Sequence, residues 1–228
     1  MTPHVIVSYD GTANDQDALA LARRFADAGA SIALAYVCHD RKADEPGSLA
    51  ADAARALLDK GAEALGAADA ARHVIHDPST ADGLRALAER ERADVIVFGS
   101  DYRTADGRVV PQKTAARLLD GGPAAIAIAP AGLHGRAVAG IERIGVLTEG
   151  DDAAARGTAG SLASALGATV AEPGSGPVDL LVVGSRPEAT EGRVLLSATA
   201  DYAIETASSA VLAVRRGAPV TFGSLVTH

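Results

Sequence analysis

Short apolar runs alternate with helical stretches along the first 130 or so positions of the chain. The predicted strands there are Val5–Tyr9, Ser31–Val37, Arg72–Ile75, Val95–Phe98 and Ala124–Ala129. Between them, apolar residues recur at helical spacing. The first two predicted helices run from about residue 14 to Ala28 and from Ser48 to Leu65. Asp77-Pro78-Ser79 then interrupts the chain, and a third predicted helix runs from residue 79 to about Arg92. Strands that alternate with helices predict βαβ units and a parallel sheet.

One pattern occurs twice. Asp94–Ser100 reads DVIVFGS and Asp179–Ser185 reads DLLVVGS. Each is followed by a polar stretch with Gly-Arg-Val, a helical segment and a second apolar run, Ala124–Ala129 or Ala210–Val214. An apolar run that ends in Gly-Ser is typical of a central parallel strand that opens into a ligand-facing loop. Its repetition predicts two related α/β units.

The second unit is shorter than the first. It repeats the opening strand at Ile144–Leu147, a helix at Ala153–Leu166 and a strand at Ala168–Ala171. Only Glu172–Pro177 then precedes the second Gly-Ser strand, which is too short for a helix and a parallel return strand. We therefore expect domains at 1–133 and 138–217, the second truncated. The tail, 218–228, has no evident partner, and we expect Pro219–His228 to fray.

Composition excludes several classes of protein. The chain has 228 residues, of which 48% are hydrophobic and 22% charged, so it is globular rather than disordered. Its net charge of −8 argues against nucleic-acid and anionic-membrane partners. The single cysteine fits a reducing compartment, and neither a secretory signal nor an apolar run of membrane-spanning length is visible. We expect a cytoplasmic protein.

These features together resemble the universal stress protein family in its tandem-domain form. Three segments carry the resemblance: VIVSYDGTANDQDAL, DVIVFGSDYRTADGRVVPQKTAARLL and DLLVVGSRPEATEGRVLLSATADYA. The resemblance implies Rossmann-like units with a parallel sheet of order 3-2-1-4-5, complete in the first unit. The family commonly dimerises through its last strand. Ala124–Ala129 and Ala210–Val214 are therefore expected to pair within one chain as an internal pseudo-dimer, and further oligomerisation stays open.

Nucleotide-binding members of that family carry the signature G-x2-G-x9-G-[S/T] after the fourth strand. In the first unit only Gly99 fits, because Tyr102, Gln112 and Lys113 occupy the other three positions. The second unit keeps Gly184 but has Pro187, Ser197 and Ala198. Glycines let backbone N–H groups approach phosphates, whereas proline donates no N–H. Both signatures are therefore degenerate, and the second unit is not expected to bind phosphate.

The first unit keeps several residues that could contact a nucleotide. The resemblance implies that Asp10 and Val37, at the ends of the first two strands, would contact adenine. Ser100 keeps a hydroxyl beside Gly99, although Gly99 could equally serve only a tight exit from its strand. Lys113 and Thr114, near the expected start of a helix, could bind an anion. ATP with Mg²⁺, another anion and an empty cleft remain alternatives, and we expect any ATP affinity to be weak.

No catalytic or metal-binding set is identified. Ser100-Asp101 lacks a histidine base. His73 and His76 lie three apart on a predicted strand and so point to opposite faces. The leading hypothesis is a non-catalytic regulatory protein of the stress response, which acts through an unknown protein partner. The alternatives are an ATP-binding switch and a slow ATPase, both using the first cleft.

Overall fold

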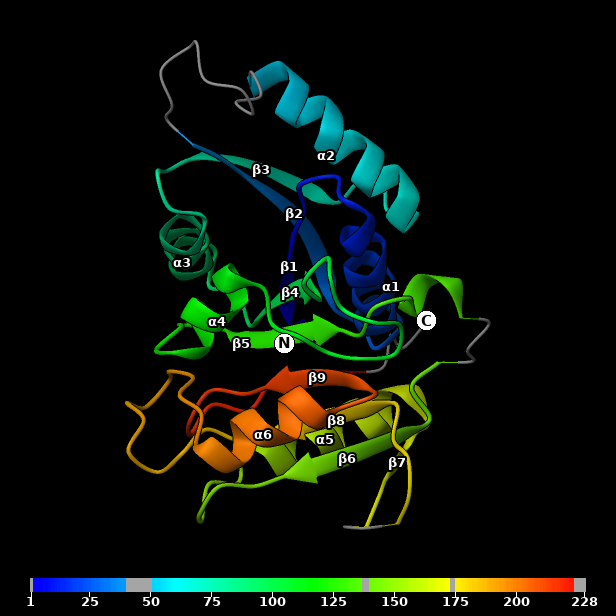
Figure 1. Cartoon of the computed structure of the whole chain (residues 1–228), viewed down its shortest axis with the longest axis vertical. Coiled ribbons are helices and arrows are strands. Elements are labelled where there is room, and N and C mark those ends of the chain that lie inside the picture. Colours follow the sequence, from blue (N-terminus) through cyan, green and yellow to red (C-terminus); the bar gives the residue numbers. More distant parts are fainter. Residues whose placement is uncertain (1, 40–50, 137–139, 173–174, 224–228) are drawn as a thin grey trace.

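A single nine-stranded sheet runs through the computed structural model, which describes residues 2–39, 51–136, 140–172 and 175–223. Its strand order is β3-β2-β1-β4-β5-β9-β8-β6-β7, and Figure 1 shows it from the upper to the lower part of the molecule. Residues 48–50, the start of the helix predicted at Ser48–Leu65, lie outside the described residues. None of the helices in the described ranges is long and apolar enough to cross a bilayer.

The first five strands form a parallel sheet of order 3-2-1-4-5, as predicted. They are β1 (His4–Ser8), β2 (Ser31–Cys38), β3 (Ala71–His76), β4 (Val95–Gly99) and β5 (Ala125–Ala129). Every residue of β4 and β5 is buried. Strands covered on both faces can be continuously apolar, which explains the unbroken runs that the sequence shows at these places.

The last four strands are also parallel to one another. They are β6 (Arg143–Leu147), β7 (Thr169–Val170), β8 (Leu180–Val183) and β9 (Ala210–Ala213). The described residues between β7 and β8 contain no helix and no strand, as predicted from the shortness of that segment. The described residues of this segment also contain no counterpart of the helix at Thr80–Glu91 of the first half.

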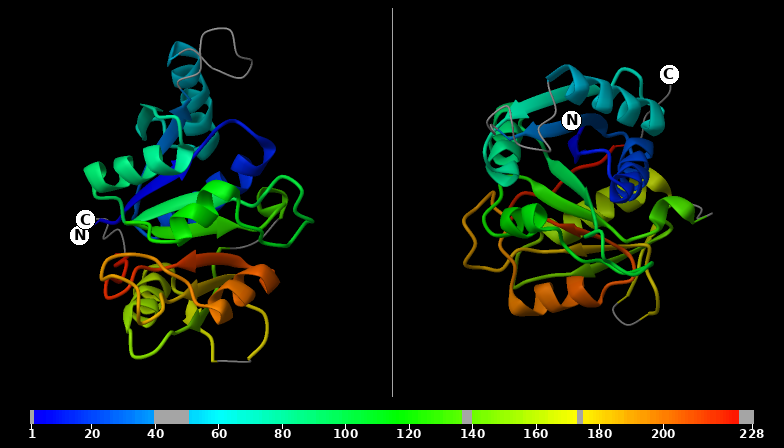
Figure 2. Two further views of the ribbon diagram at one scale, coloured as in Figure 1. Left: turned by 60° about the vertical axis from the view of Figure 1, so that its left-hand side comes forward. Right: turned by 45° about the horizontal axis from the view of Figure 1, so that its top comes forward.

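Helices cover both faces of the sheet. α1 (Ala13–Asp27), α2 (Ala51–Leu65) and α5 (Ala154–Leu166) contribute to one apolar core. α3 (Thr80–Glu91), α4 (Lys113–Leu119) and α6 (Ala198–Thr206) contribute to the other. The turned views in Figure 2 show the helices on the two sides of the strands. Each core contains residues from both halves of the chain, so the two halves share their hydrophobic interior.

The repeated sequence pattern is repeated in hydrogen bonding. The Ser100 hydroxyl donates to the carbonyl of Ala129, and the Ser185 hydroxyl donates to that of Val214, each 29 positions later and at 2.7 Å. Each hydroxyl also accepts the N–H of the residue ten positions on, at 3.3 Å for Ser100 and 3.1 Å for Ser185. In both places the serine ties the end of a Gly-Ser strand to the returning loop and to the end of the next strand.

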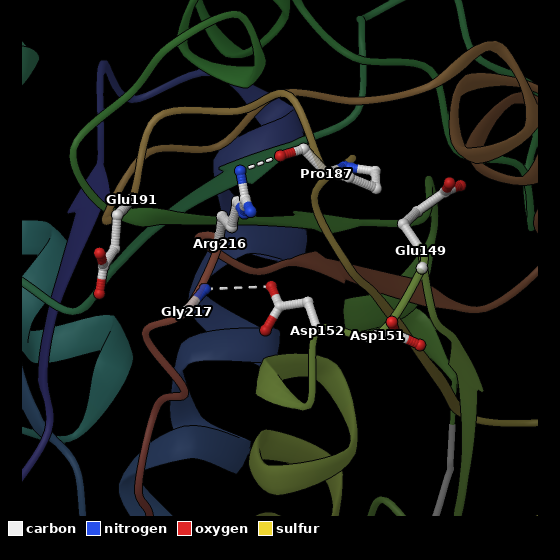
Figure 3. A pocket seen from close by; sticks show the side chains of 8 residues that line it. Glu149, Asp151, Asp152, Pro187, Glu191, Arg216 and Gly217 are labelled. Atoms are coloured by element: carbon white, nitrogen blue, oxygen red, sulfur yellow. Dashed lines mark hydrogen bonds between the residues drawn. The ribbon is translucent and has the colours of Figure 1, made fainter.

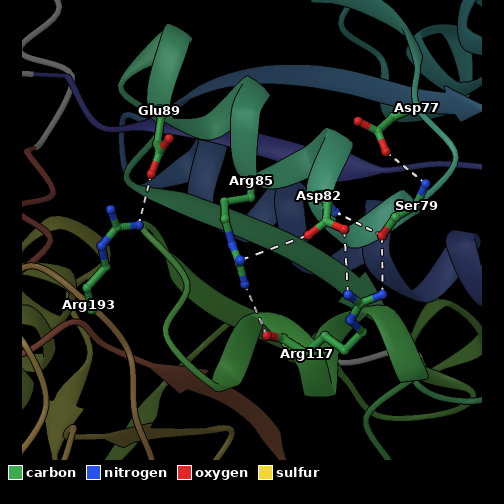
Figure 4. A network of polar contacts seen from close by, with 7 residues as sticks. All are labelled: Asp77, Ser79, Asp82, Arg85, Glu89, Arg117 and Arg193. Atoms are coloured by element: carbon green, nitrogen blue, oxygen red, sulfur yellow. Dashed lines mark hydrogen bonds and ion pairs between the residues drawn. The ribbon is translucent and has the colours of Figure 1, made fainter.

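The two halves meet where β5 and β9 pair antiparallel, with Ala127 opposite Leu212. Polar contacts reinforce this junction. Arg193 forms an ion pair of 2.9 Å with Glu89 on α3, which Figure 4 shows beside the α3–α4 network. Arg215 lies 3.5 Å from the carboxylate of Asp94. The last strands of the two halves therefore pair within one chain, as the sequence analysis expected.

The expectation that the tail frays is wrong for its described part. Val220 and Phe222 are buried, and the Phe222 ring lies 5.5 Å from that of Phe25 on α1. The Val220 N–H donates to the Thr158 hydroxyl on α5 at 2.9 Å. The tail therefore packs across α5 of the second half and α1 of the first, where its two apolar side chains complete a shared core.

Candidate functional site

A cleft lies at the carboxyl ends of the strands of the first half. It consists of two neighbouring cavities of about 160 and 410 Å³, both lined by Asp10, Gln112 and Thr114. Val37 lines the smaller cavity and Lys113 the larger. The sheet order reverses here between β1 and β4, and ligands of open α/β sheets bind at such a crevice.

The loop after β1 is folded around a buried carboxylate. Asp15, at the start of α1, accepts the backbone N–H groups of Asp10 and Gly11 at 2.8 Å and of Thr12 at 3.1 Å. Burial and then the neighbouring Asp10 carboxylate raise the pKa of Asp15 to about 7, although the N–H donors lower it. Asp15 thus holds the cleft-lining Asp10 in place, and its charge varies around neutral pH.

Gly99 is required by the packing of α1. A side chain here would place its Cβ 2.1 Å from the carbonyl oxygen of Asn14. No such conflict exists at Gly184, where the nearest atom to an added Cβ is the backbone nitrogen of Glu149, at 3.4 Å. The close approach of α1 to the end of β4 is therefore a sufficient structural reason for Gly99.

The residues at the signature positions of the first half fill the loop with side chains. Gln112 donates its side-chain amide to the carbonyl of Gly99 at 3.0 Å and so closes the loop on itself. Tyr102 is 69% exposed, and the guanidinium of Arg103 lies 4.9 Å from its ring centroid. The tyrosine ring thus lies at the mouth of the larger cavity rather than inside it.

The equivalent position in the second half holds a cavity of about 570 Å³ with a different lining. Figure 3 shows the carboxylates of Glu149, Asp151, Asp152 and Glu191 around it, with Arg216 as the cation among its lining residues. Asp152 accepts the Gly217 N–H at 3.0 Å, and Arg216 donates to the carbonyls of Pro187 and Ala189. Such an acidic lining repels the phosphates of a nucleotide.

The structure brings together four of the six residues predicted to contact a nucleotide. Asp10, Val37, Lys113 and Thr114 line the two cavities, whereas Gly99 and Ser100 do not. The Ser100 hydroxyl is turned inward and already bonded, as described above, and its residue is 2% exposed.

The sequence pattern predicts a helix that begins near Asp15 but no role for its carboxylate in the cleft, and no role for the Gln112 side chain. A carboxylate five positions after Asp10 is a weak signal for a pair, since it also fits a helix start. The Gln112 side chain reaches Gly99 only in the folded loop, and no sequence pattern announces that contact. Among the described residues, no group of three His, Cys, Asp or Glu side chains could hold a metal ion.

Comparisons with known proteins agree with this architecture. A family model of the universal stress protein family matches residues 1–130. No curated protein matches the sequence.

Some of the similar solved structures extend over nearly the whole chain. A universal stress protein from Archaeoglobus fulgidus DSM 4304 is 15% identical and has a TM-score of 0.67, covering 94% of this chain and 98% of its own. A protein of unknown function from Pseudomonas aeruginosa PAO1 is 14% identical with a TM-score of 0.66, covering 95% and 93%. At such identities the likeness concerns the fold. A universal stress protein in complex with cAMP is 24% identical, with a TM-score of 0.35, over 42% of this chain and 75% of its own.

Proposed function

Because the chain belongs to the universal stress protein family, we propose that it is a tandem, non-catalytic regulatory protein of the stress response. Its two units are 1–133 and 138–217, the second truncated. In this proposal the first unit keeps the outline of a nucleotide cleft but has lost the loop that grips phosphates, and the protein acts through contacts with other proteins. The repeated serine bonds and the β5–β9 pairing support the tandem arrangement.

The single observation that supports the proposal of a degenerate nucleotide site is the closed loop between Gly99 and Gln112. A phosphate-binding loop offers free backbone N–H groups to the anion. Here the Gln112 side chain bonds back to the Gly99 carbonyl, and several N–H groups of the loop are already engaged within it. The Asp101 N–H donates to the carbonyl of Val110 at 2.9 Å, and the Val110 N–H donates to the Ser100 hydroxyl at 3.3 Å. We therefore expect ATP with Mg²⁺ to fit the cleft poorly on its phosphate side. Asp10 and Val37, which line the smaller cavity, would be the contacts of a base.

Lys113 and Thr114 favour a second function, an ATP-binding switch that uses the same cleft. Both line the larger cavity, as Asp10 does, and Lys113 is exposed. An ammonium and a hydroxyl side by side can hold a phosphate without a glycine loop, as a point charge and a hydrogen bond. Slow ATP hydrolysis would additionally need a group that activates water. Asp101 lines the cavity but has no histidine beside it among its lining residues.

Two measurements separate these functions. Acid extraction of the purified protein should release no stoichiometric nucleotide if the regulatory proposal holds. Nucleotide recovered at near one equivalent would instead support the switch. ATP turnover by the unmodified protein should equal that of the Lys113→Ala variant. Turnover clearly above that variant would make the protein a slow ATPase and contradict the non-catalytic assignment.

A further inference from the structure

An apolar groove lies between α4 and α6, on the face of the sheet opposite α1 and α5. It has a volume of about 530 Å³. Its lining comprises Val110, Pro111, Ala116, Leu119, Asp201, Ile204 and Glu205. Figure 1 shows α4 and α6 on the two sides of the β5–β9 junction. The groove therefore exists only because the two halves of the chain are joined there.

The floor of the groove is built from equivalent residues of the two units. Leu119 near the end of α4 and Ile204 near the end of α6 occupy matching places in the repeat and are 7% and 1% exposed. Val110, beside them, is 44% exposed. Ala116 is also exposed, so apolar atoms of Val110 and Ala116 stay open to solvent beside the buried floor. A continuous apolar lining of this kind is typical of a surface that another molecule covers.

The α6 side of the groove is acidic. Asp201 and Glu205 lie four positions apart on α6, where like charges destabilise a helix. Burial, and after it the Glu205 carboxylate, raises the pKa of Asp201. α6 itself contains no lysine or arginine. Within the described part of the chain, no ion pair neutralises either carboxylate.

Two nearby arginines bond to groups other than these carboxylates, although Arg108 places its guanidinium at the end of α6. Arg108 donates to the backbone carbonyls of Glu205 and Thr206, at 3.0 and 3.3 Å. Arg117 on α4 contacts Asp82 and Ser79, as Figure 4 shows. The groove thus combines an apolar lining with two carboxylates, Asp201 and Glu205, that form no ion pair within the described residues. A complementary partner would have both apolar side chains and positive charge.

We propose that this groove binds an amphipathic helix of another protein, with an apolar stripe flanked by lysine or arginine. A helix laid between two helices presents side chains at i, i+4 and i+7 to such a groove. The added positive charges face Asp201 and Glu205. This inference deepens the protein-contact part of the proposed function and rests on that part, but it does not depend on nucleotide binding.

Other occupants fit less well. A second copy of the chain meeting groove to groove would bring two acidic α6 helices together, which like-charge repulsion opposes. An extended peptide needs a free strand edge, whereas β5 and β9 already pair with each other here. Nucleic acid is repelled by the acidic side.

The test uses the full-length protein with ¹³C-labelled Ile, Leu and Val methyl groups. The probe is a synthetic helical peptide with leucines at i, i+4 and i+7 and flanking lysines. We expect saturable shifts of the Val110, Leu119 and Ile204 methyl signals. The double variant Asp201→Asn with Glu205→Gln should weaken binding about threefold to tenfold, since two partly exposed charge pairs are lost. Ala116→Trp should abolish binding by filling the groove.

Two controls match these changes. The double variant Asp52→Asn with Glu63→Gln removes the same charge from exposed positions on α2 and should bind as the unmodified protein does. A peptide with glutamates in place of the lysines should bind at least about tenfold more weakly.

Three results would overturn the proposal. The first is that the groove signals do not shift at millimolar peptide. The second is that the α6 double variant binds the peptide as tightly as the unmodified protein does. The third is that the glutamate peptide binds as tightly as the lysine peptide. Groove signals that shift with protein concentration alone would assign the groove to a second copy. None of these results bears on the nucleotide cleft, so failure here is distinguishable from failure of the nucleotide part of the proposed function.

Discussion

Gly99 and Gly184 stand at the same place in the two repeats, yet their surroundings differ. The carbonyl of Asn14 presses against Gly99, whereas Gly184 has room for a methyl group. Both glycines stand out in the sequence because each follows a buried strand. For Gly99 the sequence is equally compatible with a role in phosphate binding and with a tight turn at the end of the strand. The deciding contact joins residues about 85 positions apart and depends on β4 lying beside β1, so no local pattern could reveal it.

We predict that Gly99→Ala destabilises the protein far more than Gly184→Ala does. The added methyl group at Gly99 would overlap backbone, which cannot move without shifting α1, and overpacking of this kind costs on the order of 2–3 kcal/mol. The matched change at Gly184 should cost less than about 1 kcal/mol. Urea unfolding of the two variants measures the difference. Equal costs would show that α1 does not pack against Gly99 as described.

Asp15 should make stability depend on pH. Its pKa is about 7 in the folded protein, against an ordinary 3.8, so the folded chain binds this proton more tightly. The stabilisation from this proton is complete at a pH below the pKa of Asp15 in the unfolded chain. It is lost as the pH rises through the pKa of Asp15 in the folded protein.

In Asp15→Asn this loss is absent. Relative to the unmodified protein, the variant should gain free energy of unfolding between pH 4 and 7, on the order of 1.4 kcal/mol per unit of pKa shift. Unfolding midpoints across that range provide the measurement. The exposed Asp27→Asn serves as control and should follow the unmodified protein. Parallel profiles for Asp15→Asn and the unmodified protein would contradict the raised pKa.

Strands and helices were predicted well where the chain alternates between apolar runs and helical spacing, and poorly where a segment is held only by distant partners. The parallel sheet of the first half follows from its βαβ pattern, whereas its strand order was implied by the resemblance to the universal stress protein family. The helix and strand missing from the second half follow from the short Glu172–Pro177 segment. The tail has only two core side chains, Val220 and Phe222, and both fill space between helices that lie far away in the sequence. A segment this short carries no periodic signal of its own.

We therefore predict that Phe222→Ala destabilises the protein substantially. Truncation of a buried phenylalanine costs on the order of 3 kcal/mol, and the ring here contacts Phe25 on α1. Thr221→Ala, at an exposed position between the two buried residues, should change stability by less than about 0.5 kcal/mol. Thermal unfolding of both variants compares them. If Phe222→Ala matched Thr221→Ala, the tail would contribute little to the folded protein.

The two halves depend on each other because they share one sheet and both apolar cores. β9 pairs with β5 along an entirely buried strand, so separation of the halves would expose Val211 and its neighbours on a bare edge. A small unit that loses this burial has little left to offset its chain entropy. The resemblance to the universal stress protein family, together with the two apolar last strands, predicted this pairing. The groove between α4 and α6 is visible only in the folded chain, where the two halves lie side by side.

Accordingly, the fragment 138–228 should not fold alone as a monomer. Circular dichroism should show no cooperative thermal transition, and sedimentation should show association that increases with concentration, because an exposed apolar strand recruits another chain. A sharp transition of a monomeric fragment would show that the second half is an independent domain.

The affinity for ATP with Mg²⁺, measured by calorimetry, tests the degenerate-cleft proposal most directly. The variant Tyr102→Gly, Gln112→Gly, Lys113→Ser restores the family signature in the first half. The matched variant Pro187→Gly, Ser197→Gly, Ala198→Ser restores it in the second, whose cleft remains acidic. We predict weak binding by the unmodified protein, at least about tenfold tighter binding by the first variant, and no gain in the second. Submicromolar binding by the unmodified protein, or a first variant that binds no better, would contradict the proposal that its side chains have closed the phosphate loop.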